Sequence, residues 1–152
     1  MFAFQILSDL HLERPEDFEH LTITPKAPNL ALLGNIGRLV QMARYYFNFL
    51  TTQLLQFKTV FLVLGNYEVH GSKWSTVKDA IDTYRLLVER KRECGQELGQ
   101  FVLLDRKAVH MNAGEDRLTV LGCTLFSKTP HDGDCFLDFD MTTDWDVTKH
   151  NE

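Results

Sequence analysis

Cysteine is scarce in this sequence, and the few cysteines are not spaced for cross-linking or metal binding. The three cysteines, Cys94, Cys123 and Cys135, include no C-x-x-C pair. An odd number of cysteines without that spacing argues against a disulfide framework or a zinc ribbon. It indicates reduced thiols, and so we expect a cytoplasmic protein.

Long hydrophobic runs are also missing. The clean apolar stretches, such as residues 60–64, are far shorter than the roughly 20 residues that a membrane span requires. The first seven residues lack a basic region and are interrupted by Gln5, which argues against a signal peptide. We therefore expect no membrane partner.

Positive charge is in deficit. The chain has 16 Lys and Arg against 21 Asp and Glu, a net charge of −5, which does not favour nucleic-acid binding by charge alone. The acidic excess is local, because residues 131–152 hold seven acidic residues and one base, Lys149. Their spacing does not match a calcium-binding loop. We interpret residues 131–152 as an acidic, partly flexible end of the chain.

The composition indicates one folded domain of the α/β class over residues 1–152. The chain is 44% hydrophobic, and its length is that of one typical domain of about 150 residues. Short apolar runs at residues 2–7, 30–33 and 60–64 are each followed by a polar residue or glycine, which is typical of strands buried on both faces. Helical spacing over residues 39–57 predicts a crossover helix between the second and third strands.

The second half of the chain continues this alternation. Apolar spacing predicts a helix over residues 74–94, with Ser72 or Ser75 as its N-cap and Gly95 at its end. Residues 101–104, 108–111 and 117–125 read as strands, the last two separated by a turn at residues 112–116.

Polar residues follow each of the first three predicted strands. Asp9 and His11 come after the first strand, Asn35 after the second and Asn66 after the third. In an open α/β sheet, ligands bind outside the carboxyl ends of the strands, so these side chains should meet at one edge. Asp9 and His11 are two residues apart and, in an extended segment, lean to the same side. A carboxylate and an imidazole suit zinc, manganese or iron.

The three strand ends together resemble the calcineurin-like metallophosphoesterase family. The quoted segments are Ser8-Asp9-Leu10-His11-Leu12-Glu13, Leu33-Gly34-Asn35-Ile36-Gly37-Arg38 and Leu64-Gly65-Asn66-Tyr67-Glu68. The family's signature runs D-x-H, then G-D, then G-N-H-[DE], each at a strand end and separated by about 25 to 30 residues. Here Asn35 lies 26 residues after Asp9, and Asn66 lies 31 residues after Asn35.

The resemblance implies a fold, a reaction and a set of site residues. The fold would be the front half of an α/β/β/α sandwich with a parallel-stranded core and crossover helices. The reaction would be metal-dependent hydrolysis of phosphate mono- or diesters. Asp9 and His11 would hold the first divalent metal ion (Mn, Fe or Zn) and Asn66 the second. Asn35 stands at the position of the bridging aspartate, and Tyr67 at the position of the catalytic histidine.

Both of the last two residues depart from the family pattern. The Asn35 amide offers no negative charge between two dications, so we expect at most one tightly bound ion. Tyr67 has a reference pKa of about 10, against about 6.5 for histidine, and is a poor proton donor near neutrality. The family's later G-H-x-H histidines have no counterpart in this sequence.

Two functional interpretations follow from these departures. The chain is either a weakened phosphoesterase acting on a phosphate ester, or a catalytically inactive relative that serves as a binding or structural module. A nucleotide phosphate loop at residues 34–37 is disfavoured, because G-x-G-x-x-G and the Walker lysine are both missing. A strand such as residues 117–125 would lack its partner sheet, and therefore we also expect self-association.

Overall fold

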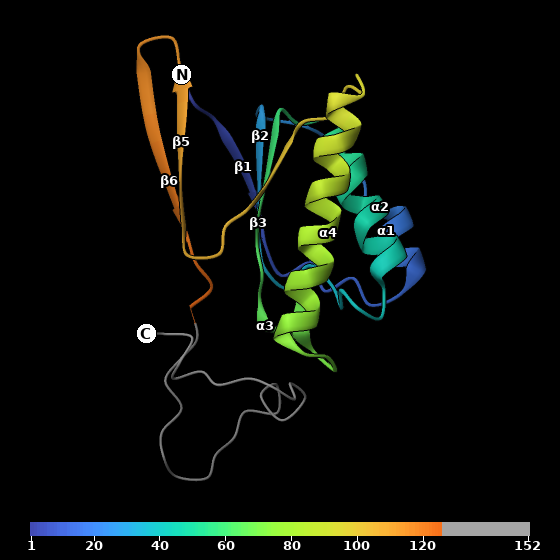
Figure 1. Ribbon diagram of the computed structural model, residues 1–152. Helices are drawn as coiled ribbons and strands as arrows, with labels where there is room; N and C mark the ends of the chain where they lie inside the picture. Colours follow the sequence, from blue (N-terminus) through green and yellow to red (C-terminus); the bar gives the residue numbers. More distant parts are fainter. Residues whose placement is uncertain (126–152) are drawn as a thin grey trace, which may run out of the picture.

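A four-stranded parallel sheet forms the centre of the protein (Figure 1). The computed structural model describes residues 1–125, and the acidic end at residues 131–152 lies outside the described residues. The strands lie in the order β1-β2-β3-β4, with the bounds Phe4–Leu7, Asn29–Leu33, Thr59–Val63 and Gln100–Leu103. The described helices are α1 (Pro15–His20), α2 (Ala43–Leu54), α3 (Asn66–Val69) and α4 (Trp74–Glu93). An antiparallel hairpin, β5 (Lys107–Ala113) and β6 (Asp116–Gly122), follows the sheet.

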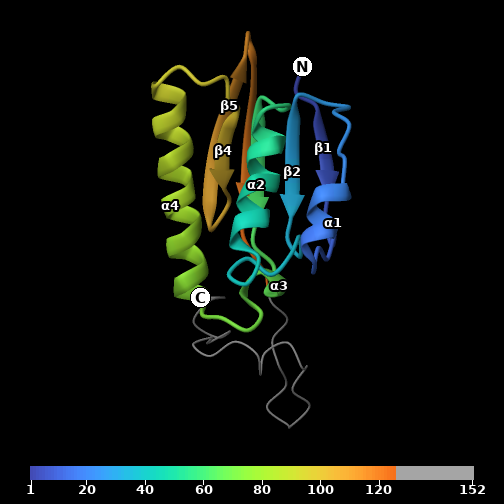
Figure 2. The ribbon, with the colours of Figure 1, turned by 90° about the vertical axis from the view of Figure 1, so that its right-hand side faces the viewer.

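Helices cover one face of the sheet and the hairpin lies against the other (Figures 1 and 2). Side chains alternate across the strands, so Leu30 and Leu62 join the main core under α2 and α4. Phe61 and Val102 point the other way and pack in a smaller cluster with hairpin residues such as Val120. The predicted α/β class is therefore confirmed, with helices, sheet and hairpin as successive layers.

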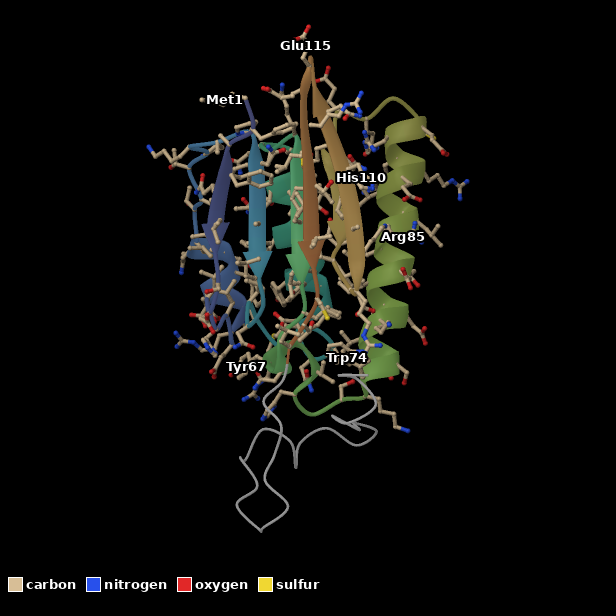
Figure 3. All side chains as sticks on the ribbon, turned by 90° about the vertical axis from the view of Figure 1, so that its left-hand side faces the viewer. Met1, Tyr67, Trp74, Arg85, His110 and Glu115 are labelled. Carbon is tan, nitrogen blue, oxygen red and sulfur yellow. The ribbon has the colours of Figure 1, made fainter. Side chains whose placement is uncertain are left out.

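The prediction that all three early strands are buried on both faces is correct for β3 alone. β3 is buried over nearly its whole length, whereas Leu33 in β2 is 45% exposed and Ile6 in β1 is 61% exposed. β1 is one of the two edge strands, and the hairpin lies over the β3 side of the sheet, leaving β1 beside it (Figure 3). The apolar run at residues 2–7 therefore does not signal double burial.

α4 begins at Trp74 as predicted, but its N-cap and both ends of α2 differ from the sequence prediction. α2 runs from Ala43 to Leu54 and not over residues 39–57, and the backbone N–H of Leu39 donates to the Glu68 carbonyl in the segment before the helix. α4 has Lys73 as its N-cap with no side-chain bond, so neither Ser72 nor Ser75 caps it. The Ser72 N–H instead closes the turn after α3 by donating to the Val69 carbonyl.

Helix α1 was not predicted from the sequence. It is six residues long and begins with Pro15, whose missing N–H costs nothing in the first turn. Asp17 accepts hydrogen bonds from the Arg14 backbone at 3.0 Å and from its guanidinium at 2.9 Å, which closes the first turn. The turn directs Phe18 into the main core.

No helix within residues 1–125 has the length and apolar character of a membrane span.

Leu50 tests the main core. Its side chain is fully buried between α2 and the sheet, so Leu50→Ala should lower the free energy of unfolding by about 2–5 kcal/mol. Leu55, 66% exposed at the end of the same helix, is the matched control. Leu55→Ala should change the free energy of unfolding by no more than about 0.5 kcal/mol. Urea denaturation of both variants measures the difference. Equal losses would contradict the assigned orientation of α2.

Candidate functional site

The loops after β1, β2 and β3 meet at one edge of the sheet. Parallel pairing aligns the three strand ends, and Tyr67 in α3 marks this edge in Figure 3. Asp9, His11 and Asn35 lie here, and Asn66 starts α3 at the same edge. The structure thus confirms that these residues lie at a common edge, as the strand-end pattern predicts.

The backbone at this edge is not extended, contrary to the sequence prediction. Asp9, His11 and Asn35 all have positive φ angles, of 54°, 48° and 54°. The loops hold one another in this conformation, because the Asp9 N–H donates to the Gly34 carbonyl at 3.1 Å and the His11 N–H to the Asn35 carbonyl at 3.0 Å. Non-glycine residues with positive φ cluster at functional sites, where the surrounding structure stabilises the strain.

The two predicted metal ligands nevertheless come close together. Asp9 Oδ1 and His11 Nε2 are 3.9 Å apart, and both side chains are about half exposed. Zinc bonds to oxygen and nitrogen measure about 2.0–2.2 Å, so one ion can touch both atoms. Hydrogen bonds from Ser8 and Asn35 lower the pKa of Asp9, which keeps its carboxylate ionised.

Asn35 is oriented by two hydrogen bonds, one at each end of its amide. Its Oδ1 accepts from the backbone N–H of Tyr67 at 3.1 Å, and its Nδ2 donates to Asp9 Oδ1 at 3.0 Å. A backbone N–H can only donate, so the amide cannot be flipped without losing both bonds. The side chain therefore presents N–H groups to Asp9, where a bridging carboxylate would present oxygen. Asn35 thus places no ligand oxygen between two metal positions, and Asp9 and His11 would be the residues to hold a single ion.

The loops after β2 and β3 approach too closely for side chains larger than hydrogen. A Cβ on Gly34, at φ +83°, would lie 3.0 Å from the Gly65 nitrogen. A Cβ on Gly65 would lie 2.8 Å from the Asn35 nitrogen and would overlap the Asn35 amide. Both glycines therefore permit the contact that fixes Asn35.

Glu68 holds this edge together from within. Its carboxylate is fully buried and accepts the backbone N–H groups of Asn35 at 3.0 Å, Ile36 at 2.7 Å and Gly65 at 2.6 Å. The Tyr46 hydroxyl donates to it from α2 at 3.2 Å. Burial raises the pKa of the Glu68 carboxyl, whereas the backbone N–H bonds act in the opposite direction. The residue is a positioning group and not a ligand.

Tyr67 lies over His11 in a small polar cluster. The two rings meet edge to face with their centres 4.7 Å apart, and the Arg38 guanidinium lies 5.4 Å from the Tyr67 ring centre. The Tyr67 hydroxyl donates to the Glu13 carboxylate. Burial and the bond to Glu13 raise the pKa of the Tyr67 phenol, so it gives up its proton even less readily than free tyrosine.

Sequence reasoning missed three residues of this edge. Glu13 and Arg38 lie within the quoted motifs but received no role, because only the structure shows both against Tyr67. Glu68 received no role either, although a glutamate three residues into a turn is a recognisable capping signal for the Gly65 N–H.

Within residues 1–125, no group of three or more His, Cys, Asp and Glu side chains is arranged to hold a metal ion.

The comparisons with known proteins give no assignment: no family model, curated protein or solved structure matches the chain.

Glu68→Gln tests the positioning role. The amide keeps one acceptor oxygen and turns N–H groups toward backbone donors, at about 1–3 kcal/mol for each buried donor left unpaired. We expect a loss of about 3 kcal/mol in the free energy of unfolding, measured by denaturant titration. The matched control is Glu89→Gln, at a half-exposed position on α4, which should lose less than about 1 kcal/mol. A stable Glu68→Gln protein would contradict the assigned role.

Asn35→Asp tests the metal capacity. The change replaces the amide N–H beside Asp9 with a carboxylate oxygen, so the affinity for Mn²⁺ should rise at least tenfold in calorimetric titration. Without metal the variant should unfold more easily than the parent, because two carboxylates then lie side by side. Asn48→Asp, an equal charge change on α2, should leave Mn²⁺ binding unchanged. Two tightly held ions in the parent chain would contradict the one-ion limit.

Proposed function

We propose that this chain binds phosphate esters at the carboxyl edge of its parallel sheet, as a metallophosphoesterase-like protein with weakened or lost hydrolysis. On the same basis, we infer that the sheet and the hairpin correspond to the front half of an α/β/β/α sandwich. The observation that carries the proposal is the locked Asn35 amide, which directs N–H groups toward Asp9. This amide favours ligand binding over two-metal hydrolysis.

The edge carries groups that suit an anionic ester. His11 offers a half-exposed imidazole, Arg38 brings a cation to the Tyr67 ring, and Asn35 offers an amide N–H beside Asp9. A divalent ion held by Asp9 and His11 would supply further positive charge for the phosphate oxygens. Arg38 contacts the Tyr67 ring and Glu13 accepts from its hydroxyl, and these two contacts hold the ring beside His11.

The same geometry accounts for the expected weakness of hydrolysis. The leaving group of an ester needs a proton, and Tyr67 is the residue at the position of the family's proton donor. Its raised pKa and its hydrogen bond to Glu13 both oppose that donation. A missing general acid costs typically 10²–10⁴-fold in rate, before the weakened second metal position is considered. The binding-module interpretation is therefore the better supported of the two.

Two measurements on one preparation test this proposal. Hydrolysis of nitrophenyl phosphate and of its bis-ester with Mn²⁺ should stay near background. Phenyl phosphate should bind with Mn²⁺ present, and binding should weaken at least tenfold in Asp9→Ala and in His11→Ala. His20→Ala, on the surface of α1, is the matched control and should bind as the parent does. Robust turnover that Asp9→Ala abolishes would establish an active hydrolase instead, and absence of any phosphate binding would overturn the proposal.

A further inference from the structure

An open groove runs between the parallel sheet and the hairpin. Its volume is about 930 Å³, which lies in the range of pockets that hold small organic ligands. The hairpin stands over the β3 side of the sheet, and β1 and β2 lie beside it uncovered (Figure 3). The groove walls are apolar along most of their length and include Ala31, Leu33, Phe61, Val63, Val120 and Leu121.

The polar end of the groove reaches the candidate site. Asn35, Gly65 and Asn66 line the groove, so it opens onto the edge where Asp9 and His11 lie. Arg106 and Lys107 line it as well, Arg106 in the connection that follows the carboxyl end of β4 and Lys107 as the first residue of β5. Amides and cations thus occupy one end, and aliphatic and aromatic carbons the rest.

This gradient of polarity matches the two parts of an amphiphile. Building on the proposed function, we propose that the groove binds the hydrocarbon chain of a single-chain alkyl phosphate ester, with the phosphate at the sheet edge. Leu33 and Leu121 are 45% and 76% exposed on either side of the groove, and an alkyl chain would remove both from water. The two walls belong to different sheets that face each other, so the occupant must be narrow.

Chain length is the direct test. Calorimetric titration of the full chain with butyl phosphate and octyl phosphate, both with Mn²⁺ and below their micellar concentrations, compares ligands with the same head. Burial of methylenes should tighten binding about threefold for each one added, and hence roughly 50–100-fold over four. Octanol, which has the same chain and no phosphate, should bind at least tenfold more weakly than octyl phosphate.

A groove variant and a matched control locate the chain. Leu33→Gln with Leu121→Gln should remove most of the gain from butyl to octyl phosphate and leave butyl phosphate binding unchanged. Leu86→Gln with Leu87→Gln makes the same change at exposed positions of α4 and should keep the gain. Circular dichroism of both double variants verifies that they fold.

The outcomes separate this inference from the proposed function. Equal binding of butyl and octyl phosphate would overturn the groove assignment and leave phosphate binding at the edge intact. Absence of binding by butyl phosphate would overturn the proposed function and this inference with it. Octanol binding as tightly as octyl phosphate would show a hydrocarbon site that does not recognise the ester. A dimer that Leu33→Gln with Leu121→Gln dissociates, together with no chain-length effect, would assign the groove to a second copy.

Discussion

The arrangement of the whole site edge depends on one buried carboxylate. Glu68 gathers N–H groups from the loops after β2 and β3, and a hydroxyl from α2, onto two oxygen atoms. Each of these groups would otherwise be a polar group buried without a partner. The carboxylate thereby converts three separate polypeptide segments into one rigid unit. Asn35 is held at its backbone by this unit and at its side chain by Tyr67 and Asp9.

The Asn35 amide gives this edge a chemistry that an aspartate of almost the same shape would not give. An aspartate would fill the same space, but it would place a second carboxylate beside Asp9. The difference lies in which atoms accept and which donate. With the amide, the protein itself donates a hydrogen bond to the ionised Asp9 carboxylate, which is partly satisfied without a cation.

Much of the fold was predictable from local patterns, because buried strands and amphipathic helices leave strong periodic signals. The runs ending at Leu33 and Val63 and the helix starting at Trp74 were identified within one residue. The short α1 was missed because six residues carry too little periodicity, and Ile6 was misassigned because an edge strand and a central strand can have the same composition.

The candidate site was predictable in part of its membership and not in its geometry, since Glu13, Arg38 and Glu68 received no role from the sequence. Strand ends brought Asp9, His11 and Asn35 to one edge, as parallel topology requires. Their left-handed backbone depends on hydrogen bonds between loops that are distant in sequence, so no local pattern reports it. The same is true of Glu13 and Tyr67, whose contact spans 54 residues.

The two ends of the hairpin are attached to the rest of the protein by contacts of different kinds. β5 and β6 form a sheet of their own, which packs on the parallel sheet through Val109, Met111 and Val120 and makes one polar contact near each end of the hairpin. At one end the Thr124 hydroxyl donates to the Leu64 carbonyl at 2.6 Å in a buried contact, and at the other an exposed ion pair joins the terminal amine of Met1 to Asp116. A buried bond of this kind outlasts an exposed ion pair in salt. Salt should therefore weaken the contact at the tip of the hairpin before the contact at the site edge, so the polar end of the groove is the better secured of the two.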